Sequence, residues 1–148
     1  MPAMITTLHG ELYAALNGHD WSSDFVDGVL VGESWDPELR HDQIDPVKAH
    51  VDVVPGDLTV SRVSAAQFLP GAVLSVAVRG RAATDIRRIA LCDFAEAVVD
   101  FLSDRANVAF SWEIIEITTA PLVHLELLKT HKVWFSHLLV KFGYEVRA

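Results

Sequence analysis

The sequence VWFSHLLVKFGYEV, residues 133–146, carries the clearest indication of the fold. Its odd positions begin apolar and become polar at Lys141 and Glu145. Its even positions are almost wholly apolar: Trp134, Ser136, Leu138, Val140, Phe142, Tyr144 and Val146. A period of two predicts a strand rather than a helix. Fully extended, this stretch would reach roughly 45 Å, well beyond a usual strand of about 5–6 residues. We therefore expect an edge strand that packs its apolar face under helices and extends towards a neighbouring chain.

Three stretches nearer the N-terminus show the same alternation. Residues 47–53 alternate valine or alanine with polar residues, and the Pro-Gly-Asp sequence at residues 55–57 predicts a turn that closes this strand. Residues 72–80 predict a second strand paired with the first, and the residues between them resemble a loop or a frayed strand. Residues 109–118 predict a third strand. With the C-terminal stretch, these make a sheet of about four strands.

Two segments have the 3.6-residue period of amphipathic helices. Residues 4–17 place one apolar stripe on a single face: Ile5, Leu8, Leu12, Ala15 and Leu16. Residues 84–103 begin at Thr84, a residue type favoured as an N-cap. The buried stripe expected for this second helix is Ile86, Ile89, Ala90, Phe94, Ala97, Val98 and Phe101. Residues 120–132 are ambiguous between helix and strand.

These elements define an α+β fold, in which a mixed or antiparallel sheet of about four strands packs against two helices. We expect residues 1–148 to form a single domain. The acidic residues 19–46 read as a long loop or arm after the first helix, in which FVDGVLVG adds a short strand or hairpin at most.

The charge balance limits the function. Twelve Lys and Arg against twenty Asp and Glu give a net charge of −8. A protein that grips phosphate backbones needs basic residues to displace counterions, so we do not expect this chain to clamp nucleic acid. An acidic surface could still line a passage through which nucleic acid slides. We also expect no membrane span, no secretory signal and, with Cys92 alone, no intrachain disulfide.

No known catalytic or phosphate-binding motif is present, and we expect no enzyme activity and no cofactor. Glu113 and Glu116 are more readily explained as strand charges that discourage aggregation than as an acid–base pair. Cys92 lies mid-helix, away from the helix N-terminus that activates thiols, so a structural role is favoured.

Metal sites are not expected either. The spacing of three histidines matches no ligand pattern: His124, His131 and His137. Four acidic residues could offer oxygen ligands to calcium, but they lack the central glycine and closing glutamate of an EF-hand loop: Asp36, Glu38, Asp42 and Asp45.

Aromatic and large apolar residues remain as candidate contact surfaces, because such residues dominate interface hot spots. In the acidic loop, we expect these side chains to contact a neighbouring chain: Trp21, Phe25, Trp35 and Leu39. On the C-terminal stretch, a place in the core is an equally good interpretation for the further contact candidates: Trp134, Phe135 and Tyr144.

The order of elements and several phrases match a known family. A first helix ends in YAALNG, a strand reads VDVVPGD, the next reads LSVAVRG, the second helix reads DIRRIALCDFAEAVVDFL, and the last strand begins VWFSHLLVKF. Over residues 4–17 and 47–146 the chain resembles the tail terminator proteins of long-tailed bacteriophages, and the tail-completion and neck proteins that share their fold. The acidic segment 19–46 is longer than the family pattern requires.

The resemblance implies a structural virion protein that is assembled in the host cytoplasm and forms a ring, usually of six copies. Such a ring caps the head-proximal end of the tail tube, stops tube polymerisation and provides the docking surface for the head or neck. Its partners would be the tail tube protein and the head–tail connector, and DNA would pass through its lumen without specific binding. No catalytic residue, cofactor, metal or membrane is implied.

Two alternatives stay open. The chain could be a head–tail joining protein of the same fold, or a small α+β ligand-binding domain or enzyme with a pocket between sheet and helices. A pocket predicts a monomer or dimer that binds a small molecule, whereas a ring predicts assembly through apolar and aromatic surfaces.

Overall fold

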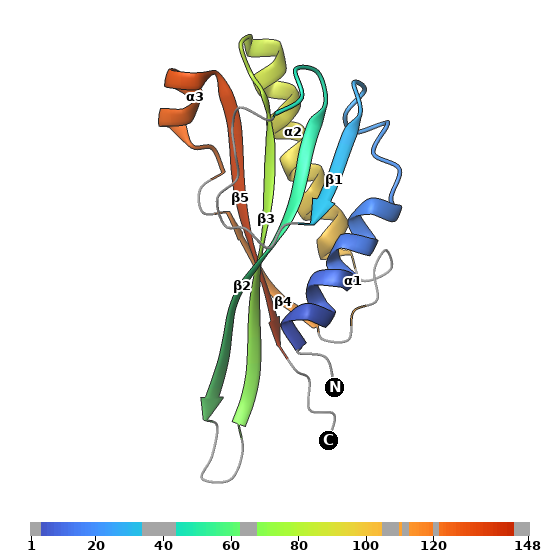
Figure 1. Ribbon diagram of the computed structural model, residues 1–148, viewed down its shortest axis with the longest axis vertical. Helices are drawn as coiled ribbons and strands as arrows, with labels where there is room; N and C mark the ends of the chain where they lie inside the picture. The colour runs from blue at the N-terminus through green and yellow to red at the C-terminus, as the bar shows by residue number, and fades with distance from the viewer. Residues whose placement is uncertain are drawn as a thin grey trace.

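The computed structural model describes residues 4–33, 44–62, 68–104, 110, 113–119 and 122–143 (Figure 1). Within these residues the helices are α1 (Met4–Gly18), α2 (Asp85–Ser103) and α3 (Leu125–His131). The strands are β1 (Val29–Glu33), β2 (Ala49–Arg62), β3 (Phe68–Arg81), β4 (Glu113–Thr119) and β5 (Val133–Gly143). The expected α+β class is confirmed, with β1 and the short α3 added to the elements that the sequence predicted clearly.

The strands form one five-stranded sheet in the order β1-β2-β3-β5-β4. β5 pairs antiparallel with β3 on one side and with β4 on the other. The expectation that the C-terminal strand is an edge strand was therefore wrong. Its apolar face was predicted correctly, because alternate residues from Trp134 to Phe142 are buried. β5 therefore forms backbone hydrogen bonds with a strand of its own chain along both edges. This pairing explains its length without a neighbouring chain.

The fifth strand, β1, pairs parallel with β2, with Val29 opposite Ala49 and Glu33 opposite Val53. It comes from the FVDGVLVG segment, in which only a short strand or hairpin was expected. The sheet is therefore mixed, with one parallel edge.

The Pro-Gly-Asp sequence does not close β2, which corrects the sequence-based prediction. The strand continues to Arg62, and its register against β3 shifts between Pro55 and Leu58. Such a shift is a β-bulge, which lets a strand carry a proline without losing its partner. The described parts of the stretch read as a loop or frayed strand, residues 58–62 and 68–71, therefore continue β2 and β3.

This hairpin extends past the body of the molecule. β1 ends opposite Val53, and β5 reaches β3 only as far as Gly71. Among the described strands, β2 and β3 beyond these positions pair only with each other. Figure 1 shows the resulting ribbon, residues 58–62 and 68–70, continuing below α1 and α2 at the end opposite α3. We call this ribbon the arm.

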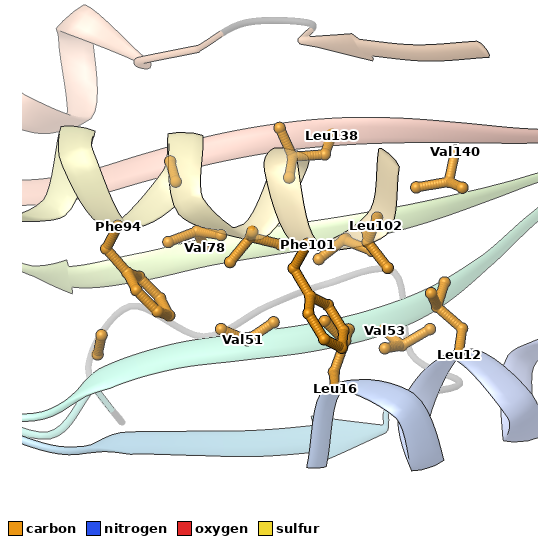
Figure 2. Close-up of a cluster of buried hydrophobic side chains, with 14 of the residues drawn as sticks. Leu12, Leu16, Val51, Val53, Val78, Phe94, Phe101, Leu102, Leu138 and Val140 are labelled. Atoms are coloured by element: carbon orange, nitrogen blue, oxygen red, sulfur yellow. The ribbon is translucent and has the colours of Figure 1, made fainter. Parts of the chain in front are cut away.

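The core lies between one face of the sheet and the two long helices (Figure 2). α1 contributes the stripe that the sequence predicted, because Leu8, Leu12 and Leu16 are fully buried. α2 contributes Leu91, Phe94, Ala95, Val98, Phe101 and Leu102. The strands complete the core with Val51, Val53, Ala72, Leu74, Val76, Val78, Leu138, Val140 and Phe142. Gly80 permits the close approach of α2 to β3, since a Cβ atom there would lie 2.7 Å from Cδ2 of Leu91.

α2 begins as predicted, with the Thr84 side chain accepting a hydrogen bond from the Arg87 backbone N–H. Its buried stripe was partly misassigned, however. Ile86 is 81% exposed and Ile89 is 62% exposed, whereas Leu91 and Ala95 are buried in their place. Over the first two turns of α2, the buried positions therefore differ from the predicted ones. The buried face is rotated about the helix axis by about one residue.

Candidate functional site

The loop that follows α1 is anchored to the core. Trp21 and Phe25 are 5% and 3% exposed, and both rings lie against Phe94 of α2 at centroid distances of 5.6 Å. The Trp21 indole N–H also donates a hydrogen bond of 2.8 Å to the Leu16 carbonyl at the end of α1. The expectation that these two side chains are displayed for a neighbouring chain needs correction, because the chain's own helices cover them.

The C-terminal candidates divide between core and surface. Trp134 is 6% exposed, and its indole N–H donates to the Ser136 hydroxyl, so it belongs with the core residues. Phe135, on the other face of β5, is half-buried beside the His137 ring. The remaining candidates lie outside the described residues: Trp35, Leu39 and Tyr144. A contact of any of the seven with another chain stays a prediction.

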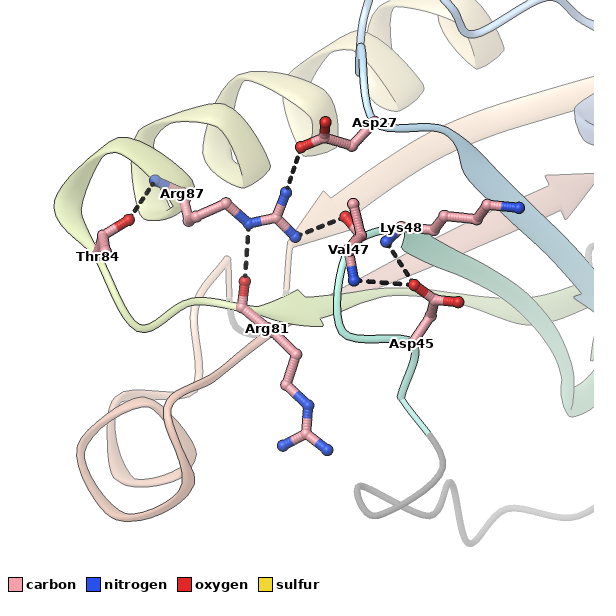
Figure 3. Close-up of polar contacts among 7 residues, drawn as sticks. All are labelled: Asp27, Asp45, Val47, Lys48, Arg81, Thr84 and Arg87. Carbon is pink, nitrogen blue, oxygen red and sulfur yellow. Dashed lines mark hydrogen bonds and ion pairs between the residues drawn. The ribbon is translucent and has the colours of Figure 1, made fainter.

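Arg87 holds together the end of the molecule at which α2 begins (Figure 3). Its Nη1 atom lies 2.8 Å from the Asp27 carboxylate, its Nη2 donates to the Val47 carbonyl at 2.8 Å, and its Nε donates to the Arg81 carbonyl at 3.2 Å. The guanidinium also lies 5.1 Å from the centre of the Phe25 ring, at cation–π distance. One side chain thus joins α2, the loop before β1, the start of β2 and the end of β3.

Asp45, the described member of the proposed acidic cluster, has a local structural role. Its carboxylate accepts hydrogen bonds from the backbone N–H groups of Val47 and Lys48, which lowers its pKa (Figure 3). Its own N–H donates to Nε2 of His50 at 2.8 Å. The carboxylate therefore caps the turn that enters β2. The other members of that cluster lie outside the described residues: Asp36, Glu38 and Asp42.

The face of the sheet opposite α1 and α2 carries a buried ion pair. Arg79 donates to the Asp52 carboxylate at 2.8 Å, and their side chains are 8% and 15% exposed. His50 is the register partner of Arg79, and burial, followed by the Arg79 charge, lowers the pKa of His50. The pair fixes β2 against β3 but forms no constellation of nucleophile, base and orienting group.

A second histidine is buried at the other side of the sheet. His9 of α1 is 1% exposed, its Nε2 lies 2.9 Å from the Val53 carbonyl, and its Nδ1 lies 3.6 Å from the Glu33 carboxylate. These contacts join α1 to β1 and β2. They explain why a polar residue is tolerated in the apolar stripe of α1.

The described residues include no group of three or more His, Cys, Asp or Glu side chains that could hold a metal ion. His124 instead caps α3 by accepting from the Leu127 N–H, and His131 is exposed in the last turn of that helix. Burial, assisted by Glu96 and Asp93, raises the pKa of the Cys92 thiol, which agrees with an unactivated structural cysteine. None of the described helices combines the length and apolarity that crossing a bilayer requires.

The distinctive feature of the described surface is instead a set of exposed apolar side chains. Large apolar residues with more than a third of their surface exposed are Val26, Leu30, Val47, Ile86, Ile89, Ile115 and Leu125. Val26 and Val47 adjoin the Arg87 contacts, Ile86 and Ile89 lie on the first turns of α2, and Leu125 begins α3. Figure 1 shows the first turns of α2 and α3 together at the end opposite the arm. Exposed apolar groups gathered in this way are typical of interaction surfaces.

The sequence contained a signal for the exposure of Ile86 and Ile89. Positions 86, 89, 93, 96 and 100 follow one another at three- and four-residue steps along one helix face, and Asp93, Glu96 and Asp100 occupy the last three. These three acidic residues are exposed in the structure. A face that carries three carboxylates could not have been the buried one, so the two isoleucines above them had to face outward.

The architecture defines the class of protein: an α+β domain with a mixed sheet, one face of which is covered by two long helices. Among solved structures, a chain in the virion of a native gene transfer agent particle has the same fold, with a TM-score of 0.60. The match covers 99% of this chain and 100% of that chain at 14% sequence identity. At this identity the likeness shows the fold. No family model and no curated protein sequence matches the chain.

Proposed function

We propose that the chain is a structural virion protein that forms a ring at the head-proximal end of a tail tube. The ring caps the tube, stops its polymerisation and provides the docking surface for the head or neck. The observation that carries this proposal is the likeness of the whole chain, from end to end, to a chain of a virion particle. A likeness that spans both chains in full argues that the entire fold, rather than one shared motif, serves the assembly.

The surface of the described residues supports the proposal. Its distinctive groups are large apolar side chains at one end and a two-stranded arm at the other. A protein held between two axial partners needs two different ends, and this molecule has them. The net charge of −8 fits a ring through which DNA passes without being retained.

A head–tail joining protein of the same fold is the second candidate, because the virion likeness does not distinguish positions within a tail. The partners in either case are a second copy of this chain, the tail tube protein and the head–tail connector. Six copies per ring and a place in the tail or neck follow from the family resemblance and belong to the proposal.

Deletion of the gene from a particle-producing strain tests the proposal, with electron microscopy of the lysate. For a terminator, tubes lacking the cap continue to polymerise and exceed their normal length. For a joining protein, tails of normal length accumulate beside unattached heads. Particles that form normally without the chain would contradict both assignments. Addition of the purified wild-type protein to deletion lysates is the matched control and should restore joined particles.

A further inference from the structure

Two exposed helical surfaces of the chain both carry apolar side chains and have charges of opposite sign. The first is the outer stripe of α2, formed by Ile86, Ile89, Asp93 and Glu96. The second is the outer stripe of α3, formed by Leu125, Lys129 and Lys132. Each stripe begins with exposed apolar side chains at its N-terminal end and continues into charges of a single sign.

The α2 stripe is electrostatically unfavourable in an isolated chain. Asp93, Glu96 and Asp100 repeat at three- and four-residue steps, at which like charges repel. The last turn of α2 holds no basic residue, although the negative end of a helix dipole favours cations there. No ion pair joins these three carboxylates to another side chain among the described residues. A local arrangement that opposes folding in this way is typical of a surface selected for binding.

The α3 stripe supplies the complementary groups. Leu125 and Lys129 lie four residues apart on one face of this short helix, and Lys132 follows directly as its C-cap in the left-handed conformation. Leu125 is 61% exposed, and both lysines are exposed. In the described part of the chain, neither lysine forms an ion pair. Two free cations beside an exposed leucine are distinctive in a protein that carries a net charge of −8.

The two stripes would lie at about the same level in a ring whose axis follows the long axis of the molecule. Subunits that are related by rotation about one axis meet only through surfaces at the same level along that axis. Figure 1 shows α3 and the first turns of α2 at the same end of the molecule, with α3 at the left margin and α2 to its right. Two different surfaces of one chain that complement each other give a head-to-tail contact, which closes into a ring when the rotation permits.

We propose that the α3 stripe of one copy docks on the α2 stripe of the next copy. Leu125 then packs against Ile86 and Ile89, while Lys129 and Lys132 pair with Asp93 and Glu96. This contact rests on the proposed ring function and specifies the surfaces through which its copies associate. It also provides partners for the carboxylates on α2, because the neighbour's lysines neutralise their charges.

Charge reversal with rescue tests the contact, with sedimentation velocity as the measurement of self-association. The variant Lys129→Glu/Lys132→Glu, and separately the variant Asp93→Lys/Glu96→Lys, should weaken association roughly tenfold or more, since several surface ion pairs are replaced by repulsion. A chain that carries all four reversals should associate again, because its charges are complementary once more. An equimolar mixture of the two single-surface variants should do so as well.

Single charge reversals outside the two stripes serve as controls for the location of the contact. Lys141→Glu and Glu116→Lys reverse exposed charges on β5 and β4, and each should associate as the wild-type chain does. Ile86→Ser should weaken association while circular dichroism and the urea midpoint stay unchanged, because Ile86 contributes little to the core.

Three outcomes overturn the contact: a wild-type chain that stays monomeric at all concentrations, reversals that leave association unchanged, or four reversals that fail to restore it. If the wild-type chain assembles but the reversals have no effect, these surfaces are wrong while the ring function stands. If the deletion strain makes normal particles, the ring function fails, whatever the reversals do to self-association.

Discussion

Some single residues bind several elements of this fold at once, and Arg87 is the clearest of them. Its guanidinium uses all three of its nitrogen atoms, and its partners come from three separate segments of the chain. Two of those partners are backbone carbonyls, those of Arg81 and Val47. The planar fork of arginine, with donors in fixed directions, is what the arrangement requires.

Replacement of Arg87 by lysine should therefore destabilise the chain even though the positive charge is kept. Lysine carries its three donors on a single nitrogen atom, so it cannot reproduce the spacing of the arginine fork, and at least one of the three acceptors loses its partner. We expect a loss of about 1–3 kcal/mol in the free energy of unfolding, measured by urea denaturation. Arg88→Lys is the control, since among the described residues the Arg88 side chain donates to one carbonyl, that of Ala82, and lies 3.8 Å from Asp85. If the two variants lose equal stability, Arg87 does not hold these segments together.

His50 gives the molecule a pH-dependent stability. Burial and the Arg79 charge hold the pKa of His50 below its ordinary value of 6.5, although Asp52 and Asp45 act in the opposite direction. The unfolded chain therefore binds the proton more readily than the folded one, so this stability is present above pH 6.5 and is lost as the pH falls through the folded pKa. Protonation of Nε2 would also remove the acceptor of the Asp45 N–H.

We expect the free energy of unfolding to decrease as the pH is lowered from about 7.5 to about 5.5, above the range in which most carboxylates titrate. The variant His50→Gln keeps a hydrogen-bond acceptor but cannot take up the proton, so its decrease over this range should be smaller. Urea titrations of both proteins at several pH values give the comparison. Parallel curves for the two would show that His50 does not contribute.

Among the elements, the strands and α1 followed from the sequence because their periods of two and 3.6 residues were clear. The sequence predicted the pairing of β2 with β3, which the structure confirms, but not the partners of the other strands. The alternation in β5 is the same for an edge strand and for a central strand with one buried face, so its place between β3 and β4 could not be predicted. The Pro-Gly-Asp sequence was ambiguous as well, because these residues serve in bulges as well as in turns.

The burial of Trp21 and Phe25 could not be predicted for a related reason. An acidic composition indicated that the loop after α1 is solvated, but composition does not show where an aromatic ring points. Trp21 and Phe25 reach back to α2, which only the tertiary fold determines. The outer face of α2 was predictable in principle, since its carboxylates repeat with the helical period. Apolar character alone placed Ile86 and Ile89 in the core, and the neighbouring charges should have taken precedence.

The packing of α2 on β3 depends on a missing side chain at Gly80. A Cβ atom there would lie 2.7 Å from Cδ2 of Leu91, which is fully buried. We expect Gly80→Ala to destabilise the chain by about 1–3 kcal/mol through overpacking, and Leu91→Ala to do so by about 2–5 kcal/mol through a cavity. The double variant should lose less than the sum, because the new methyl group occupies part of the cavity.

Gly10→Ala in α1 is the matched control, since a Cβ atom there meets nothing within 4 Å. The same substitution in an open helical position should stabilise the chain by about 0.5–1 kcal/mol. Urea unfolding of the four variants provides all the required free energies. Additive losses at Gly80 and Leu91 would mean that the two positions do not compete for the same space.

At the scale of the whole molecule, the two ends differ in what they offer a partner. One end gathers exposed apolar side chains around the first turns of α2 and α3, and the other extends the arm past the body (Figure 1). Two-stranded ribbons are marginally stable in water when nothing packs against them. The arm is therefore the part of the sheet whose stability should depend most on an assembly partner.

Hydrogen exchange tests this expectation. In the free chain, the backbone amides of the arm, residues 58–62 and 68–70, should exchange much faster than those of Val51, Val76 and Leu138. The latter lie in strands paired on both edges under the helices, and opening them requires a larger part of the fold to unfold.

Mixing the protein with purified tail tubes should slow exchange in the arm while leaving the central strands unchanged. Equal protection of arm and centre in the free chain would mean that the ribbon is stable by itself. Exchange in the arm that stays fast after tubes have bound would show that the tube contacts the other end of the molecule.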